Sequence, residues 1–157
     1  MELVETLNEL NVVTPNRDTI VSFEKMVSAM PNAQFGDMPE CPLKHSFADG
    51  IYVREIFIPA GTLLVGKIHK HEHPNMFVSG DVSVYTEYDG VQRLNKPTSM
   101  ISKSGTKRVV YAHQDTIWIT YHRTDKTDLK EIEAEIIVPS YDDLELSVDT
   151  IKQIKGE

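Results

Sequence analysis

An all-β barrel or sandwich is the fold class that the sequence predicts, on two observations. From about residue 50 onward, short runs of aliphatic, β-branched and aromatic residues alternate with turn residues, which is typical of strands. Asp89-Gly90 lies between two of these runs, and this dipeptide favours the tight turn of a β-hairpin. The expected strands are 51–58, 62–69, 76–79, 82–88, 100–102, 107–111, 116–122 and 131–138.

Ahead of the strands, residues 1–49 are expected to form an N-terminal helix and a wrapping segment. Thr14 and Pro15 supply helix start signals, and apolar side chains follow at helical spacing within 15–30. This stripe consists of Ile20, Phe23, Val27 and Met30. It is expected to pack on the main domain or on a second subunit, because so short a helix has little stability alone. The prolines and glycine of residues 31–49 indicate an irregular connection.

The remaining elements follow the strand pattern to residue 138. Ser79-Gly80 predicts a turn between two strands, and 131–138 alternates charged with apolar residues, as a strand with one wet face does. After Pro139 the tail 139–157 is left without a strand, and a final helix is an alternative there. The expected domains are therefore 1–49 for the helix and wrapping segment, 50–138 for the barrel, and 139–157 for the tail.

Composition narrows the classes of function. The 157 residues, 40% of them hydrophobic, suit one globular domain. A formal charge of −8 opposes binding to a nucleic-acid backbone, which needs a basic face. No apolar stretch is long enough to cross a bilayer and the N-terminus lacks a signal-peptide pattern, so a soluble, cytoplasmic, non-secreted protein is expected. Cys41 has no cysteine partner and is interpreted as a packed or idle thiol.

Three histidines at alternating positions are the most informative pattern in the chain. His69, His71 and His73 directly follow the strand-like run 62–68. In an extended strand every second side chain points to the same face, so these three imidazoles are candidates to converge on one metal ion or ligand. Surface decoration is the alternative interpretation.

The chain resembles the cupins in two segments. Residues 59–80 resemble the first cupin segment, in which a glycine, a His-x-His pair, a glutamate and a second glycine follow one another. Residues 102–111 resemble the second, a Pro-x-Gly-x-x-His turn and strand. The resemblance implies a double-stranded β-helix, or jelly-roll barrel, whose interior binds a divalent metal such as iron, manganese, nickel or zinc.

The metal motif of the cupins is degenerate in this chain. Counting back from Gly80, the glutamate position falls on His73 and the two histidine positions on Lys67 and His69, while the histidine of the second segment falls on Arg108. A register with His69 and His71 as the pair leaves too short a distance to Gly80. His113 or His122 can supply a missing ligand, and His122 shares a strand face with Trp118 and Thr120. A site of His69, His73 and His122 is one resulting candidate.

Two functions from different classes remain open. The first, slightly favoured, is a non-catalytic protein that binds a small anionic molecule in a positive barrel pocket. The candidate pocket residues are Lys67, His69, His71, His73, Arg108, Tyr85 and Trp118, with core packing as the alternative for the two aromatics. The second is a metal-dependent enzyme of the oxygenase or isomerase class that uses His69 and His73.

The overall pattern also resembles small, uncharacterised cupins encoded by tailed bacteriophages. That resemblance implies ligand capture or a virion or assembly role, and a location in the host cytoplasm. Cupins of this kind usually pair through barrel edges or helical extensions, so a homodimer is expected.

Overall fold

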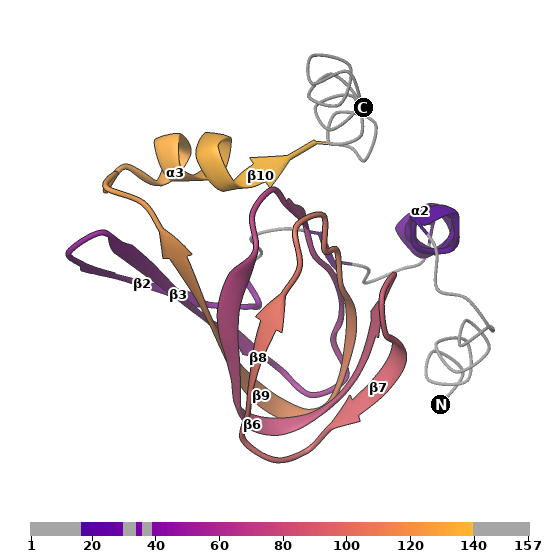
Figure 1. Cartoon of the computed structure of the whole chain (residues 1–157). Helices are drawn as coiled ribbons and strands as arrows, with labels where there is room; N and C mark the ends of the chain where they lie inside the picture. The colour runs from indigo at the N-terminus through magenta and orange to yellow at the C-terminus, as the bar shows by residue number, and fades with distance from the viewer. Residues whose placement is uncertain (1–16, 30–33, 36–38, 140–157) are drawn as a thin grey trace, which may run out of the picture.

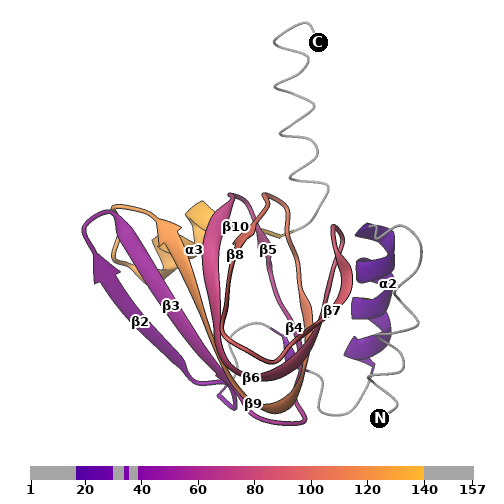
Figure 2. The same ribbon diagram turned by 60° about the horizontal axis from the view of Figure 1, so that its bottom comes forward.

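The computed structural model describes residues 17–29, 34–35 and 39–139, and it confirms the all-β prediction. Most of the strands curl into a barrel, α2 lies along its side next to β7, and α3 lies across one end (Figures 1 and 2). The helices are α2 (Arg17–Ser28) and α3 (Leu129–Ile136). The strands are β1 (Gln34–Phe35), β2 (Leu43–Ala48), β3 (Ile51–Ile58), β4 (Leu63–Val65), β5 (Ile68–His69), β6 (His73–Thr86), β7 (Gly90–Leu94), β8 (Thr98–Ser102), β9 (Val109–Arg123) and β10 (Ile137–Val138). None of the described helices is long and apolar enough to span a membrane.

Two long antiparallel strands, β6 and β9, organise the barrel. β6 pairs with β8 through its first half and with β7 through its second, while β9 pairs with β3 and β4. The two long strands also pair with each other, with register shifts between Phe77 and Val82. Each spans two of the strands that the sequence predicts, because the chain bends at these points without leaving the sheet.

Gly80 makes the bend in β6 possible. Its φ of +117° is a conformation that L side chains rarely adopt. A Cβ at this position would overlap the Thr116 hydroxyl and lie 2.8 Å from the carbonyl oxygen of Asp115. The predicted turn at Ser79-Gly80 is therefore a bulge within one strand, at a point where β6 and β9 lie close together.

The hydrophobic core has separate inner and outer parts. The interior cluster draws on β3, β4, β6 and β9, and its largest members include Phe77 and Trp118, whose rings meet edge to face. The outer cluster joins Ile20 of α2 to Val65, Tyr85 and Val109. Lys107 is ion-paired with Glu24 of α2. Together these contacts attach α2 to the barrel, as its apolar stripe predicts for Ile20; the side chains of Phe23 and Val27, and all of Met30, lie outside the described residues.

The strand prediction for 131–138 is wrong, because most of this segment forms α3. Asp128 caps the helix by accepting hydrogen bonds from the amides of Lys130 (3.1 Å) and Glu131 (3.0 Å). Ile132 and Ile136, four residues apart, are buried together against Tyr52. Only β10 remains extended, and it pairs with β5 at the end of the barrel.

The sheet also begins earlier than the predicted boundary at residue 50. β2 lies inside the segment expected to wrap irregularly, and it pairs with β3 along its whole length. The tail, apart from Pro139, lies outside the described residues.

Candidate metal centre and adjoining cavity

Three histidines from different strands meet at one end of the barrel. His69 ends β5, His73 begins β6, and His122 lies next to the last residue of β9. Their potential ligand atoms all lie within 4.8 Å of one another. The ring centroids are 4.6 Å apart for His69 and His73, 4.6 Å for His73 and His122, and 5.5 Å for His69 and His122. The sequence-derived candidate site of these three residues is thus brought together.

Hydrogen bonds position the backbone of His69 and the rings of His73 and His122. The amide of His69 donates to Thr106, and its carbonyl accepts from Gly105, so the 103–106 turn holds it from both sides. The Nδ1 of His73 lies 3.1 Å from the carbonyl oxygen of His71, the contact of a ring that donates from Nδ1 and directs Nε2 at the cluster. The Nε2 of His122 lies 3.1 Å from the hydroxyl of Thr120.

The three rings are held in their neutral form. Burial is the main cause that lowers the pKa of His69 well below its usual value, and the nearby His73 and Arg108 add to the shift. Burial likewise lowers the pKa of His73, against a hydrogen bond to His71 that raises it. For His122, burial and then His73 lower the pKa to about 3. Neutral imidazole is the state that binds metal ions.

These residues fit a divalent transition metal. His73 and His122 are only 2% and 4% exposed. The Nδ1 of His69 and the Nε2 of His73 are buried and have no hydrogen-bond partner in the described part of the chain. Buried polar atoms without a partner are costly and rare, and a metal ligand is one explanation for them. Imidazole nitrogens bound to one zinc ion lie about 3.4 Å apart, so binding requires a small inward movement of the rings.

A cavity of about 230 Å³ adjoins the histidines inside the barrel. Ile56, Ile58, Leu64 and Val110 form an aliphatic wall, and the β3–β9 register places Ile56 and Ile58 away from the His122 end. Helix α3 lines the cavity at the histidine end with side chains that include Ile132 and Ile136. In Figure 1, α3 and β10 lie at the upper end of the barrel.

Arg108 and Trp118 line the same cavity. The Arg108 guanidinium lies over the Trp118 ring, 5.3 Å from its centroid, and donates a hydrogen bond to the hydroxyl of Ser102. Burial lowers the pKa of Arg108 to about 10, which leaves the guanidinium charged at neutral pH. Both residues are where the sequence interpretation places them.

Lys67 lies at the cavity mouth. It is partly exposed and forms an ion pair of 2.5 Å with Glu133 of α3. It therefore lines the cavity, as predicted, but its charge is already matched by a carboxylate.

Of the predicted pocket residues, His71, His73 and Tyr85 are not among those that line the cavity, although His73 belongs to the histidine cluster beside it. His71 is exposed and is not among the cavity-lining residues, because β5 ends at His69 and the chain bends before β6 begins at His73. The alternation expected of one continuous strand therefore does not apply to it. Tyr85 packs in the outer core under α2, on the face of β6 opposite its inward-facing neighbour Val84.

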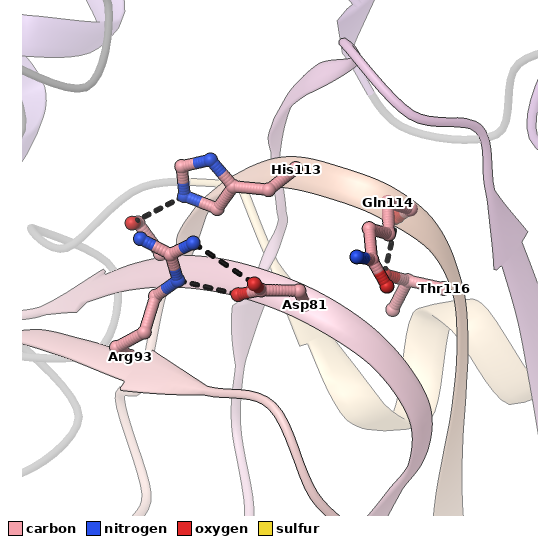
Figure 3. A network of polar contacts seen from close by, with 6 residues as sticks. Asp81, Arg93, His113, Gln114 and Thr116 are labelled. Carbon is pink, nitrogen blue, oxygen red and sulfur yellow. Dashed lines mark hydrogen bonds and ion pairs between the residues drawn. The ribbon is translucent and has the colours of Figure 1, made fainter.

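His113, the alternative third ligand, belongs to a separate polar network (Figure 3). Its Nε2 lies 2.8 Å from the hydroxyl of Ser83, close to the ion pair of Asp81 with Arg93. The ring also meets Tyr111 edge to face. It takes no part in the histidine cluster.

Sequence reasoning missed several cavity residues on β2, β3 and α3. Tyr52 and Arg54 line the cavity, and His45 approaches it with Nδ1 2.6 Å from the Tyr52 hydroxyl. The signal was available, because Tyr52, Arg54, Ile56 and Ile58 alternate along a strand that was predicted with its observed bounds.

Two solved structures that align at TM-scores above 0.5 support the fold. The salicylate 1,2-dioxygenase of Pseudoaminobacter salicylatoxidans, solved with gentisate adducts, aligns at a TM-score of 0.52 and 12% identity over 78% of this chain and 35% of that chain. The ectoine synthase of P. lautus aligns at 0.51 and 10% identity over 73% of this chain and 86% of that chain. A cupin domain from Bordetella pertussis Tohama I aligns at 0.43 and 14% identity over 57% of this chain and 98% of that chain.

No known family profile matches the sequence, and no curated protein matches it. Identities of 10% and 12% establish a fold and not an activity. The described strands and these likenesses together give the chain a cupin-type double-stranded β-helix, with a helix attached to its side and a histidine cluster inside it.

Proposed function

We propose that this protein is a metal-dependent enzyme that binds one divalent transition metal through His69, His73 and His122 and acts on a small anionic molecule in the adjoining cavity. The observation that carries the proposal is a pair of buried ring nitrogens, one on His69 and one on His73. Among the described residues they have no hydrogen-bond partner, and they lie beside a third buried imidazole. Among metals that suit three imidazoles are zinc, iron and nickel.

The chain supplies a binding chamber around this centre. A divalent ion held by three protein ligands supplies a Lewis acid and an open coordination position. The aliphatic wall and the buried side chains of α3 make much of the cavity surface nonpolar, and electrostatic interactions are stronger in such surroundings than in water. Arg108 provides a fixed positive charge for an anionic ligand, and the neutral imidazoles leave the charge of the metal to be balanced by that ligand.

A non-catalytic anion-binding protein is the second candidate function. It is favoured by Arg108, a charged side chain that lines the cavity and has no carboxylate partner among the described residues. A phage-encoded capture or assembly role and a homodimer belong to this second proposal, which rests on the sequence resemblance alone.

The test of the metal centre is elemental analysis of protein purified without a histidine tag. We expect close to one iron, nickel, zinc or manganese ion per chain, lost in His73→Ala and in His122→Ala. His71→Ala is the matched control, because this exposed histidine lies two residues from His73 and outside the cluster. Circular dichroism checks that each variant is folded. Metal-free protein whose melting temperature does not rise with any of these ions would overturn the proposal, as would equal metal loss in the control.

A further inference from the structure

A network of buried polar contacts links Trp118, Asn75 and Ser102 to the guanidinium of Arg108, which lines the cavity. The indole Nε1 of Trp118 donates to the side-chain oxygen of Asn75 at 2.9 Å. The Asn75 side-chain nitrogen donates to the hydroxyl of Ser102 at 2.7 Å, and this hydroxyl also accepts from Arg108. The Trp118 ring then lies against the guanidinium and completes the circuit. Asn75, Ser102 and Trp118 are all buried.

Such a network is costly to bury, and its main effect here is to set the position of Arg108. Asn75, Ser102 and Trp118 come from β6, β8 and β9, and polar groups buried at such positions are costly unless they are hydrogen-bonded. A satisfied buried network specifies one geometry, so the guanidinium is held by a hydrogen bond at its edge and by a ring at its face. A stacked guanidinium with fixed orientation is suited to two-point recognition of a planar anion.

Most of the hydrogen-bonding capacity of Arg108 is left for a ligand. A guanidinium carries five N–H donors, and among the described residues only Ser102 accepts one of them. The one carboxylate among the cavity-lining residues is Glu133, and it is paired with Lys67 at the mouth. Asp89 acts on Arg108 only through its charge, so among the described residues no carboxylate forms an ion pair with this guanidinium.

The nonpolar wall and the volume of the cavity limit the size and polarity of the rest of an anionic ligand. Its wall opposite the histidines is aliphatic, with Ile56, Ile58, Leu64 and Val110. A volume of about 230 Å³ is below the range of roughly 300–1,000 Å³ that is usual for drug-sized ligands. The cavity thus has a nonpolar wall and one guanidinium. It suits a small ligand with an apolar body and a single anionic group.

We propose that the cavity binds a small carboxylic acid, with its carboxylate on Arg108 in two-point contact, its apolar body against the aliphatic wall, and Asn75, Ser102 and Trp118 as the residues that position the guanidinium. This inference rests on the proposed function for the role of the metal, but not for carboxylate binding itself. A carboxylate is favoured over a phosphate because the planar guanidinium of Arg108 offers two parallel donors to it, and Lys67, another cation of the cavity lining, is already paired with Glu133.

The fluorescence of Trp118 can be used to measure ligand binding in the cavity. It is the single tryptophan of the chain and lies against Arg108, so its fluorescence reports on a ligand at the guanidinium. The probes are benzoate and cyclohexanecarboxylate, with benzamide as the uncharged match to benzoate and inorganic phosphate as the competing anion. Each is titrated into zinc-loaded and into chelator-treated protein, and calorimetry confirms the dissociation constants.

We expect both acids to bind at least tenfold more tightly than benzamide and than phosphate. Arg108→Lys, which keeps the charge but loses the fork, should reduce acid affinity at least tenfold. Arg93→Lys is the matched control, because it makes the same replacement at an exposed arginine paired with Asp81 outside the cavity. Ser102→Ala should weaken acid binding severalfold and lower the acid-over-amide ratio, with metal content unchanged.

The outcomes separate this inference from the metal proposal. Acid binding that depends on Arg108 in a protein that takes up no metal supports the carboxylate site while the metal centre fails. Tighter binding of phosphate than of either acid, or equal acid affinity in Arg108→Lys and the parent, overturns the carboxylate site. A Ser102→Ala variant with parental affinity and selectivity overturns the positioning role of the network.

Discussion

Acidification should destabilise the metal-free protein well above the pH at which carboxylates titrate. His122 has a folded-state pKa of about 3, and an unfolded histidine titrates near 6.5. Between these values the unfolded chain binds more protons than the folded one, so stability rises with pH and is lost as pH falls below about 6.5. Linkage gives a loss of about 2 kcal/mol for this residue between pH 7 and pH 5. His69 and His73 shift in the same direction and add to the loss.

Urea unfolding of chelator-treated protein at pH 7, 6 and 5, followed by Trp118 fluorescence, measures this loss. His122→Asn removes the residue whose titration is invoked, so its unfolding free energy should fall by about 2 kcal/mol less than that of the parent over the same range. Asp81 does not interfere, because its contact with Arg93 lowers its pKa and moves its titration below this window. Equal unfolding free energies at pH 7 and pH 5, or an unchanged slope in the variant, would refute the reasoning.

Three further predictions concern the barrel and helix α3. Gly80→Ala should cost about 3 kcal/mol or more in urea unfolding, from positive φ and overlap with Thr116, whereas Gly61→Ala, with φ of +83° and open space around it, should cost about 1 kcal/mol. Equal costs would contradict the close approach at Gly80. Asp128→Ala should cost about 1 kcal/mol and speed amide exchange in α3 first, because it removes the N-cap; uniform exchange would contradict this. Glu133→Gln should change stability by less than about 1 kcal/mol, since its ion pair with Lys67 is largely exposed; a larger loss would show a role beyond that pair.

The sequence predicts the barrel strands well where alternation is strict. The bounds of β3 match because its inward positions are apolar or line the cavity and its outward ones are more exposed. β6 and β9 are longer than expected, because the pairing that carries each strand through its bend comes from residues distant in the chain. The local sequence indicates the bend at Gly80, but it does not show that pairing with β9 continues on both sides of the bend.

Helix α3 was missed although a signal for it was present. Glu131 to Ile136 alternates in a way that suits a strand, and the same residues place Ile132 and Ile136 one helical turn apart. Asp128 followed three residues later by Glu131 has the spacing of a helix-capping pair, and the observed Asp128 cap decides between the two periods. Burial against Tyr52 then stabilises the helix.

The candidate site could be predicted in part. His69 and His73 follow from the spacing to Gly80, and the shared strand face of Trp118, Thr120 and His122 is confirmed by their common place along the cavity. His71 could not be placed correctly without knowing that the chain bends between β5 and β6. The cavity-lining residues of α3 could not be assigned to the site from the sequence, because their place in it depends on where α3 crosses the barrel.

The departures from the cupin motif compensate one another along β9. Arg108 stands where the resemblance expects a histidine, immediately before β9, and His122 stands near its other end. Because this strand curls around the barrel, both ends face one cavity, and the charge of Arg108 acts on His122. A single strand thus brings an anion-binding group and a metal-ligand candidate to the same chamber. The two roles should therefore separate by mutation, with His122→Ala losing metal and retaining acid binding, and Arg108→Lys doing the reverse.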